Sequence, residues 1–231
     1  MSEVEWWDFD DAGELAAQAA GDIGFVISSA IEAHGGARIA LSGSRGPEAL
    51  FDALLAADID WSRVTLLPTD EPLGSGEEKP HRHFEALFGA RGARVLTLVE
   101  DDGLADYREI GRRADERLGA IPWPLDLVIF GMGDEGEVAG LVPGPDYERV
   151  IAGPNERRAA GVEGEDGADR RVTLTAAALR SARTAMILIS GAEKKALLER
   201  AIEQGPLSRY PVGRLIAEMD IPIDIFWKRE S

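Results

Sequence analysis

The chain has 231 residues, of which 45% are hydrophobic and 29% charged, a composition typical of a folded globular protein rather than a disordered one. Its net charge of −17 argues against nucleic acid or an anionic membrane as a partner, because binding to either needs a basic surface. The absence of cysteine excludes disulfides and thiolate metal sites, and the apolar runs are far shorter than the roughly 20 residues of a membrane span.

The N-terminus and the overall composition bear on location and domain organisation. The acidic segment MSEVEWWDFDD has neither the basic nor the apolar region of a signal peptide, and together with the lack of cysteine this favours a cytoplasmic protein. There is no internal repeat, low-complexity tract or linker. We therefore expect one domain over residues 1–231, and the sequence leaves the oligomeric state open.

Short apolar runs alternate with amphipathic stretches along the first half of the chain. Apolar residues recur at helical spacing from Leu15 to Ile31, and the pair Gly35-Gly36 ends that run. In chain order we expect a helix over 14–34, a buried strand over 38–42, a helix opened by Pro47, and strands over 64–67 and 95–99.

The second half continues the alternation. We expect a helix over 104–118, a strand over 125–130, strands over 157–162, 171–174 and 185–189, helices over 193–203 and 212–218, and a last strand over 221–226. Strands separated by helices imply right-handed crossovers. The predicted fold class is therefore α/β, a Rossmann-like and mostly parallel sheet with helices on both faces.

In such sheets ligands bind outside the carboxyl ends of the strands, where this chain has three suitable loops. The first is Gly43-Ser44-Arg45-Gly46, in which glycines allow close backbone approach and the following helix offers free N–H groups. Arg45 adds a guanidinium suited to phosphate. This loop is a candidate anion site, and the alternative is a tight turn with an exposed arginine.

The other two loops carry carboxylates. Asp70, in Thr69-Asp70-Glu71 after the strand at 64–67, has the placement of a general base or of a group that orients a sugar hydroxyl. The segment 131–137 follows the strand at 125–130, and its glycines allow sharp turns that bring Asp134, Glu135 and Glu137 to the same edge. A capping acid and a solvated acidic turn are the structural alternatives.

Ordered motifs along nearly the whole chain resemble the 6-phosphogluconolactonase family, which belongs to the same fold group as glucosamine-6-phosphate deaminase. LSGSRGP at 41–47 resembles the family's L-S-G-G-S-T-P phosphate loop, and PTDEPL at 68–73 resembles its V-D-E-R segment. DLVIFGMGDEGEVAGLVPG at 126–144 resembles D-L-V-L-L-G-M-G-x-D-G-H-T-A-S-L-F-P-G, the most specific of the matches. RVTLT at 171–175, GAEK at 191–194 and PVGRL at 211–215 match three further landmarks.

The chain departs from the family pattern at positions that carry chemistry. Glu137 stands where the family has the histidine expected to activate water, Glu135 replaces an aspartate, and Gly140 replaces a serine. Pro72 stands where the family has an arginine. A partly desolvated glutamate can still serve as a general base, so the change at Glu137 leaves hydrolysis open.

The resemblance assigns roles to individual residues. Glu137, Asp70 and Glu135 are the candidates for catalysis. The candidate phosphate-binding residues are Gly43, Ser44, Arg45, Gly46, Arg171, Lys194 and Arg214. No cofactor is implied. His81-x-His83 has a spacing that can bind a metal, but no carboxylate partner is evident from the sequence, so no metal site is assigned.

The leading hypothesis is a hydrolase that converts 6-phosphogluconolactone to 6-phosphogluconate. A catalytically impaired paralogue that binds or senses a sugar phosphate is the first alternative. An amino-sugar-phosphate isomerase or deaminase, with Asp70 as the base, is the second. In each case the expected partner is a small sugar phosphate.

Overall fold

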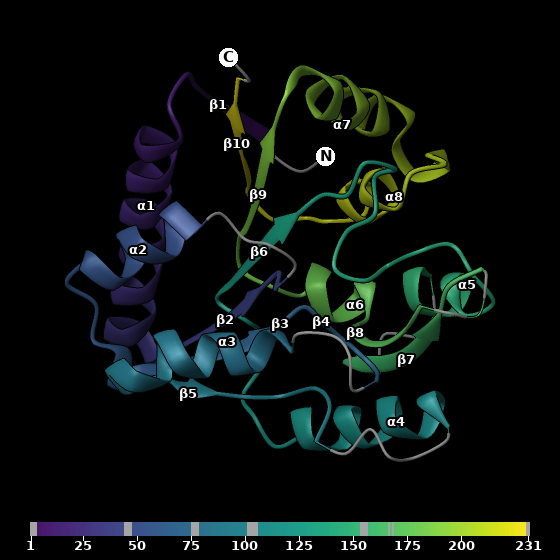
Figure 1. The fold of residues 1–231 in the computed structure, drawn as a ribbon, viewed down its shortest axis with the longest axis horizontal. Coiled ribbons are helices and arrows are strands. Elements are labelled where there is room, and N and C mark those ends of the chain that lie inside the picture. The colour runs from purple at the N-terminus through teal and green to yellow at the C-terminus, as the bar shows by residue number, and fades with distance from the viewer. Residues whose placement is uncertain are drawn as a thin grey trace.

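The computed structural model describes residues 4–43, 48–74, 79–100, 106–152, 157–165, 167 and 169–229, and its centre is a seven-stranded parallel sheet (Figure 1). The strand order is β1-β10-β9-β6-β2-β3-β5. These strands are β1 (Val4–Phe9), β2 (Ala37–Leu41), β3 (Val64–Pro68), β5 (Arg94–Val95), β6 (Leu127–Gly131), β9 (Ala185–Ser190) and β10 (Ile223–Lys228). The predicted α/β class with a parallel sheet is confirmed.

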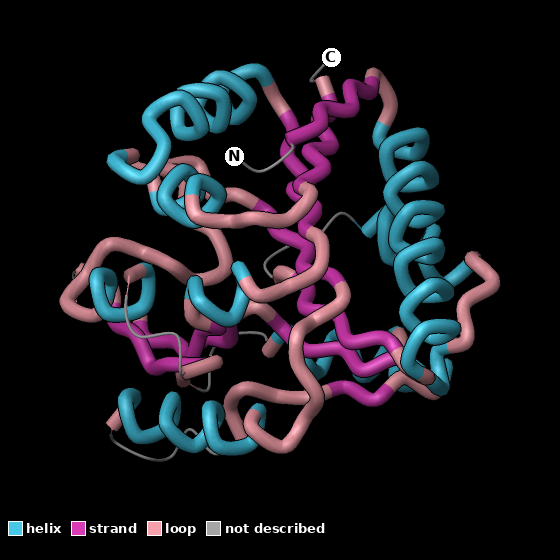
Figure 2. The backbone as a smooth tube through the Cα atoms, turned by 180° about the vertical axis from the view of Figure 1, so that it is seen from behind, coloured by secondary structure: helices cyan, strands magenta, loops and turns pink. Residues whose placement is uncertain are grey.

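Helices cover both faces of this sheet. The helices in the described part of the chain are α1 (Ala12–His34), α2 (Glu48–Ala56), α3 (Pro80–Leu87), α4 (Tyr107–Leu118), α5 (Tyr147–Ile151), α6 (Ala176–Arg180), α7 (Ala192–Gln204) and α8 (Pro211–Ala217). Helices α1 and α2 lie on one side of the sheet, and α7 and α8 lie on the other, as the front and rear views both show (Figures 1 and 2).

Alternation along the central strands explains the two covered faces. Ile39 and Ile129 pack in a core cluster with α1, α2 and α3, whereas the adjacent Ala40 and Phe130 pack in the second cluster, on the α7 and α8 side. Successive side chains of a strand point to opposite faces, so a strand buried on both sides reads as a continuous apolar run. This is why the segment at 125–130 was recognisable as a strand.

A second, smaller sheet has the order β4-β8-β7 and is antiparallel. Its strands are β4 (Asp70–Pro72), β7 (Ala159–Glu163) and β8 (Arg170–Leu174). The strands predicted at 157–162 and 171–174 therefore exist but lie outside the parallel sheet, and the predicted loop at 69–71 contains a strand. Pairing with β8 places Asp70 opposite Thr173 and Pro72 opposite Arg171.

The strand predicted over 95–99 is wrong beyond Val95. The backbone N–H groups of Leu98 and Val99 donate to the carboxylate of Glu71 instead of to a neighbouring strand. Strand β1 and helix α3 were not predicted. Two predicted helix starts lie outside the described residues: residue 104, and Pro47 for the helix after the strand at 38–42. The described helices begin at Tyr107 and Glu48.

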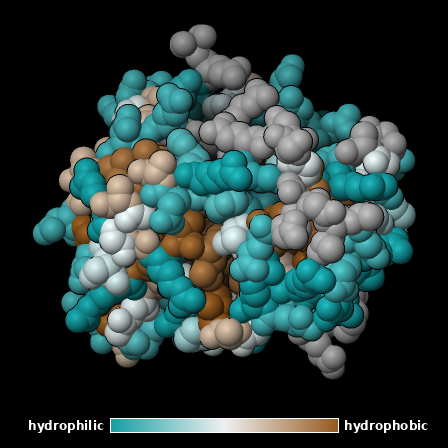
Figure 3. Space-filling model, turned by 60° about the horizontal axis from the view of Figure 1, so that its bottom comes forward, coloured by the Kyte–Doolittle hydropathy of each residue, from teal (hydrophilic) through white to brown (hydrophobic). Residues whose placement is uncertain are grey.

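Hydrophilic residues cover most of the face shown in Figure 3, with apolar residues showing between them. Among the described residues, the large hydrophobic side chains that are exposed are Trp7, Phe25 and Leu207. None of the described helices combines the length and the apolar character that crossing a membrane would require.

Candidate active site

A cavity of about 650 Å³ lies at the carboxyl edge of the parallel sheet. Ser42 after β2, the Gly-rich segment after β6, Ser190 at the end of β9 and Lys228 at the end of β10 contribute to its wall. Its size falls within the range of small-molecule sites, and its position is the one at which open α/β sheets bind ligands.

The Gly-rich segment folds back on itself beside this cavity. The N–H of Gly133 donates to the carbonyl of Glu137 at 2.9 Å, and the N–H of Gly136 donates to the carbonyl of Gly133 at 3.2 Å. A side chain at Gly133 would collide with the Glu137 carboxylate, because its Cβ would lie 2.2 Å from Oε2. The absence of a side chain at residue 133 therefore leaves the space that the Glu137 carboxylate occupies.

Glu137 and Glu135 have different surroundings. Glu137 is half-buried and lines the cavity, and its Oε2 accepts the backbone N–H of Glu135 at 3.0 Å. The side chain of Glu135 is exposed and is not part of the described cavity wall. Since a carboxylate can accept several hydrogen bonds, Glu137 keeps acceptor capacity for a ligand or water.

Asp70 and Arg171 form an ion pair on the wall of the cavity. Nη1 of Arg171 lies 2.7 Å from Oδ2 of Asp70, and Thr69 Oγ1 donates to Oδ1 at 3.1 Å. Nη2 of the same arginine lies 2.6 Å from Oδ1 of Asp169. Burial raises the pKa of Asp70 above its ordinary value, and the adjacent Arg171 charge only partly opposes that effect.

The pair has room because residue 140 is a glycine. A Cβ there would lie 2.7 Å from Cβ of Asp70 and 2.9 Å from Cδ of Arg171. Gly140 also has φ of +66°, which a residue with a side chain adopts only with strain. The glycine that departs from the family pattern is thus matched to the close approach of the two charged side chains.

Lys194 brings a cation from the first turn of α7. Its Nζ donates to the carbonyl of Met132 at 2.8 Å and lies 3.1 Å from Oδ1 of Asp134, which is 90% exposed. The contact with Asp134 is weak because solvent screens it. Lys194 and Lys228 of β10 both line the cavity. Because its contact with Asp134 is weak, Lys194 can offer its charge to an anion.

The predicted phosphate loop is only partly described. Gly43 follows Ser42, and its missing side chain lets Pro80 of α3 approach, since a Cβ there would lie 2.1 Å from Cβ of Pro80. Ser44, Arg45 and Gly46 lie outside the described residues. Their role in holding phosphate stays a prediction.

The side chain of Arg214 contacts helix α5. Its guanidinium binds the Glu148 carboxylate at 2.6 and 2.9 Å and lies 5.2 Å from the centre of the Tyr147 ring. Arg214 does not appear in the described cavity wall. The expectation that it lies near the pocket came from its motif alone and stays a prediction.

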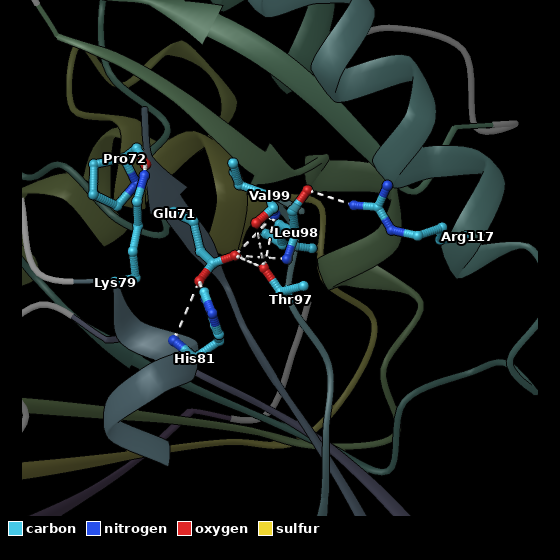
Figure 4. Close-up of polar contacts among 8 residues, drawn as sticks. All are labelled: Glu71, Pro72, Lys79, His81, Thr97, Leu98, Val99 and Arg117. Atoms are coloured by element: carbon cyan, nitrogen blue, oxygen red, sulfur yellow. Dashed lines mark hydrogen bonds and ion pairs between the residues drawn. The ribbon is translucent and has the colours of Figure 1, made fainter. Parts of the chain in front are cut away.

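Glu71, the neighbour of Asp70, lies in the interior and is not among the described residues that line the cavity. Figure 4 shows the groups that surround its carboxylate. Its Oε2 accepts the N–H groups of Leu98 and Val99 at 2.6 and 3.0 Å and the hydroxyl of Thr97 at 2.8 Å. Its Oε1 lies 2.5 Å from Nδ1 of His81 and accepts the backbone N–H of that residue. This carboxylate joins β4 to α3 and to the segment after β5.

The same contacts bear on the H-x-H motif. His81 turns to Glu71, while His83 packs against the ring of Phe51. Across the part of the chain that the structure describes, no three potential metal ligands come together.

The cavity wall includes two charged residues, Asp169 and Lys228, that the sequence did not point to. Nothing in the sequence shows that Arg171 folds back on Asp169. Lys228 was not singled out, although a basic residue at the carboxyl end of the last strand was a usable signal.

Comparisons with known proteins agree with this fold. A family profile described as glucosamine-6-phosphate isomerases/6-phosphogluconolactonase matches residues 10–223. A 6-phosphogluconolactonase of Rhizobium meliloti (strain 1021) is 30% identical over 95% of this chain and 96% of its own length. One from Pseudomonas aeruginosa is 30% identical over 94% of this chain and 90% of its own.

Solved structures show the same fold. A 6-phosphogluconolactonase of Shewanella baltica OS155 superposes with a TM-score of 0.88 at 24% identity, over 98% of both chains. A monomeric glucosamine-6-phosphate deaminase superposes with a TM-score of 0.72 at 17% identity, over 96% of this chain and 97% of its own. At these identities the likeness concerns the fold alone.

Proposed function

This chain belongs to the glucosamine-6-phosphate isomerase/6-phosphogluconolactonase family, and we propose that it is a hydrolase that opens the ring of 6-phosphogluconolactone to give 6-phosphogluconate. Relatives with that name match it over nearly the full length of both chains. The observation that carries the proposal is the half-buried Glu137 carboxylate, which lines a ligand-sized cavity at the position of the family histidine.

In the proposed reaction Glu137 is the general base. Its carboxylate takes a proton from water while the water oxygen attacks the lactone carbonyl carbon, which forms a tetrahedral oxyanion. The bond between that carbon and the ring oxygen then breaks, and the protonated Glu137 returns the proton to the leaving oxygen. The products are a hydroxyl group and a carboxylic acid, which ionises at neutral pH.

The Glu135 N–H supports this role for Glu137. By donating to Oε2, it fixes one carboxylate oxygen and leaves the other as the acceptor for the proton of water. The side chain of Glu135 takes no part in the proposed step.

The cations of the cavity serve the anionic groups of substrate and product. Lys194 and Lys228 provide positive charge along one part of the wall, and Arg171 provides it beside Asp70. The predicted contribution of Ser44, Arg45 and Gly46 adds backbone donors and a guanidinium for the phosphate. These local charges are needed because the whole molecule carries a charge of −17.

Asp70 has a supporting part in this proposal. Both of its oxygens already accept hydrogen bonds, one from Thr69 and one from Arg171. It is therefore better suited to hold Arg171 against the cavity than to abstract a proton from a sugar carbon.

The test is an assay of freshly prepared 6-phosphogluconolactone with micromolar protein. Release of acid measures the rate of hydrolysis, which is compared with the rate of spontaneous hydrolysis without protein. We expect turnover clearly above background, and a fall in kcat of roughly 10²- to 10⁴-fold in Glu137→Gln, the usual contribution of a general base. Glu137→His should recover at least about 10-fold over Glu137→Gln, since imidazole is also a general base.

Glu135→Gln is the matched control, because it removes the same charge two residues away and retains the backbone N–H. Its kcat should stay within about threefold of the parent, as is usual for a side chain outside the reacting groups. A wild-type rate equal to background, with thermal stabilisation by 6-phosphogluconate, would instead identify a sugar-phosphate binder.

A further inference from the structure

A second depression, of about 420 Å³, lies between α4, α5 and β7. Charged side chains dominate its wall: Arg108, Arg112, Arg149, Arg157 and Asp146. We call it the arginine depression. It shares no wall residue with the catalytic cavity, although Val142 of the cavity and Pro145 of the depression belong to one loop.

A buried carboxylate positions two of the arginines. Asp146 is 2% exposed, and its Oδ1 lies 3.1 Å from Nη2 of both Arg108 and Arg149. Its Oδ2 accepts the hydroxyl of Tyr107 at 2.8 Å. Arg149 is held further by the carbonyl of Gly161 at 2.9 Å. One negative charge thus anchors two guanidinium groups, each of which has five N–H donors.

The other two arginines add to this positive surface. Arg112 binds Glu109 with two contacts of 2.7 Å and also contacts Glu116, so these glutamates orient it and offset part of its charge. Arg157 enters from the residue pair before β7, and its side chain is exposed. The wall itself carries four cations and one carboxylate, on a chain whose net charge is −17.

We propose that the arginine depression is a second anion site, which binds a small molecule bearing a phosphate or pyrophosphate group. Guanidinium groups recognise phosphate oxygens through paired hydrogen bonds, and a site with surplus positive charge favours a dianion. The volume is enough for a small phosphorylated metabolite. This inference does not depend on the proposed lactonase activity.

The probe is inorganic pyrophosphate, titrated by isothermal calorimetry into the full chain at constant ionic strength. Arg157→Gln and Arg112→Gln should each weaken binding about 10-fold or more, the effect of losing one charge-assisted hydrogen bond. Arg113→Gln is the matched control. Arg113 adjoins Arg112, contacts the same Glu109 at 3.2 Å and carries the same charge, but is not among the wall residues of the depression.

A further variant separates the two anion sites. Lys194→Met removes a cation of the catalytic cavity and should leave pyrophosphate binding at the arginine depression within about twofold of the parent. Thermal melting verifies that every variant is folded. The proposal is overturned if the wild type binds no pyrophosphate at millimolar concentration, if Lys194→Met abolishes all binding, or if Arg113→Gln weakens it as much as Arg112→Gln.

Discussion

Asp70 and Glu71 are adjacent on β4 and are both buried, yet they face different parts of the molecule. Glu71 points into the interior, where backbone N–H groups, a hydroxyl and a histidine surround its carboxylate. Asp70 points to the cavity, where its main partner is Arg171, a side chain that itself lines the wall. The comparison teaches that burial of a carboxylate does not by itself mark a reactive site. A better indication is whether its hydrogen-bond donors belong to the interior or to a side chain that lines the cavity.

The largest expected effect is on the interior face of β4. Glu71→Ala takes the acceptor from the backbone N–H groups of His81 and Leu98 and removes further contacts with His81 Nδ1, Thr97 and Val99. It should lower the free energy of unfolding by about 3–5 kcal/mol, the usual result of breaking a buried charged network. Urea denaturation measures it. Glu32→Ala, at an exposed position of α1, is the control and should change stability by less than about 0.5 kcal/mol. A loss below about 1 kcal/mol would show that Glu71 is not the junction we describe.

The next effect concerns the crowded cavity face. Gly140→Ala places a Cβ against Asp70 and Arg171, and the cost is overpacking in addition to the strain of a positive φ. Gly35→Ala, at φ of +85° with no atom within 4 Å of the added Cβ, carries the backbone strain alone. The difference between the two losses of unfolding free energy should be about 1–3 kcal/mol. Equal losses would mean that Asp70 and Arg171 move aside for the added Cβ without lowering the free energy of unfolding.

The cavity wall also shows what the sequence could and could not predict. The Gly-rich segment at 131–144 and the buried strand before it were recognisable, because their pattern is local. The contact between Asp70 and Arg171 joins residues 101 positions apart and depends on space left at Gly140, which no local pattern encodes.

The failed strand at 95–99 has the same cause. Its residues have strand propensity, but a carboxylate from β4 takes the N–H groups that a strand neighbour would have used. Arg214 illustrates another limit: its motif suggested a place near the pocket but did not reveal its hydrogen bond to Glu148 of α5.

A smaller effect concerns the response of Asp70, on the cavity face, to pH. Burial raises the pKa of Asp70 above its ordinary value of 3.8, so the protonated form is favoured more in the folded than in the unfolded state. Its contribution to stability is present below pH 3.8 and is lost as pH rises through the higher folded-state pKa. The unfolding free energy of wild type minus that of Asp70→Asn should therefore fall as pH increases above 3.8 and then level off.

Denaturant titrations of both proteins between pH 3 and pH 8 measure this difference at each pH. A difference that grows with pH would have the opposite sign, and would mean that Arg171 outweighs the burial of Asp70.

The smallest expected effect tests whether an ion pair outside the cavity matters to catalysis. Arg214 and Arg171 each bind a carboxylate, but only Arg171 belongs to the described cavity wall. Arg214→Gln should leave kcat/KM for 6-phosphogluconolactone within about twofold of the parent. The ion pair that it breaks is screened by solvent, and neither partner is part of the described cavity wall. Arg171→Gln removes a charged donor from the wall and should lower kcat/KM by about 10-fold or more. A loss in Arg214→Gln as large as that in Arg171→Gln would show that α8 contributes to the site in a way that the hydrogen bonds of Arg214 do not reveal. The partners of a charged side chain would then not indicate, outside β4, whether it acts at the cavity.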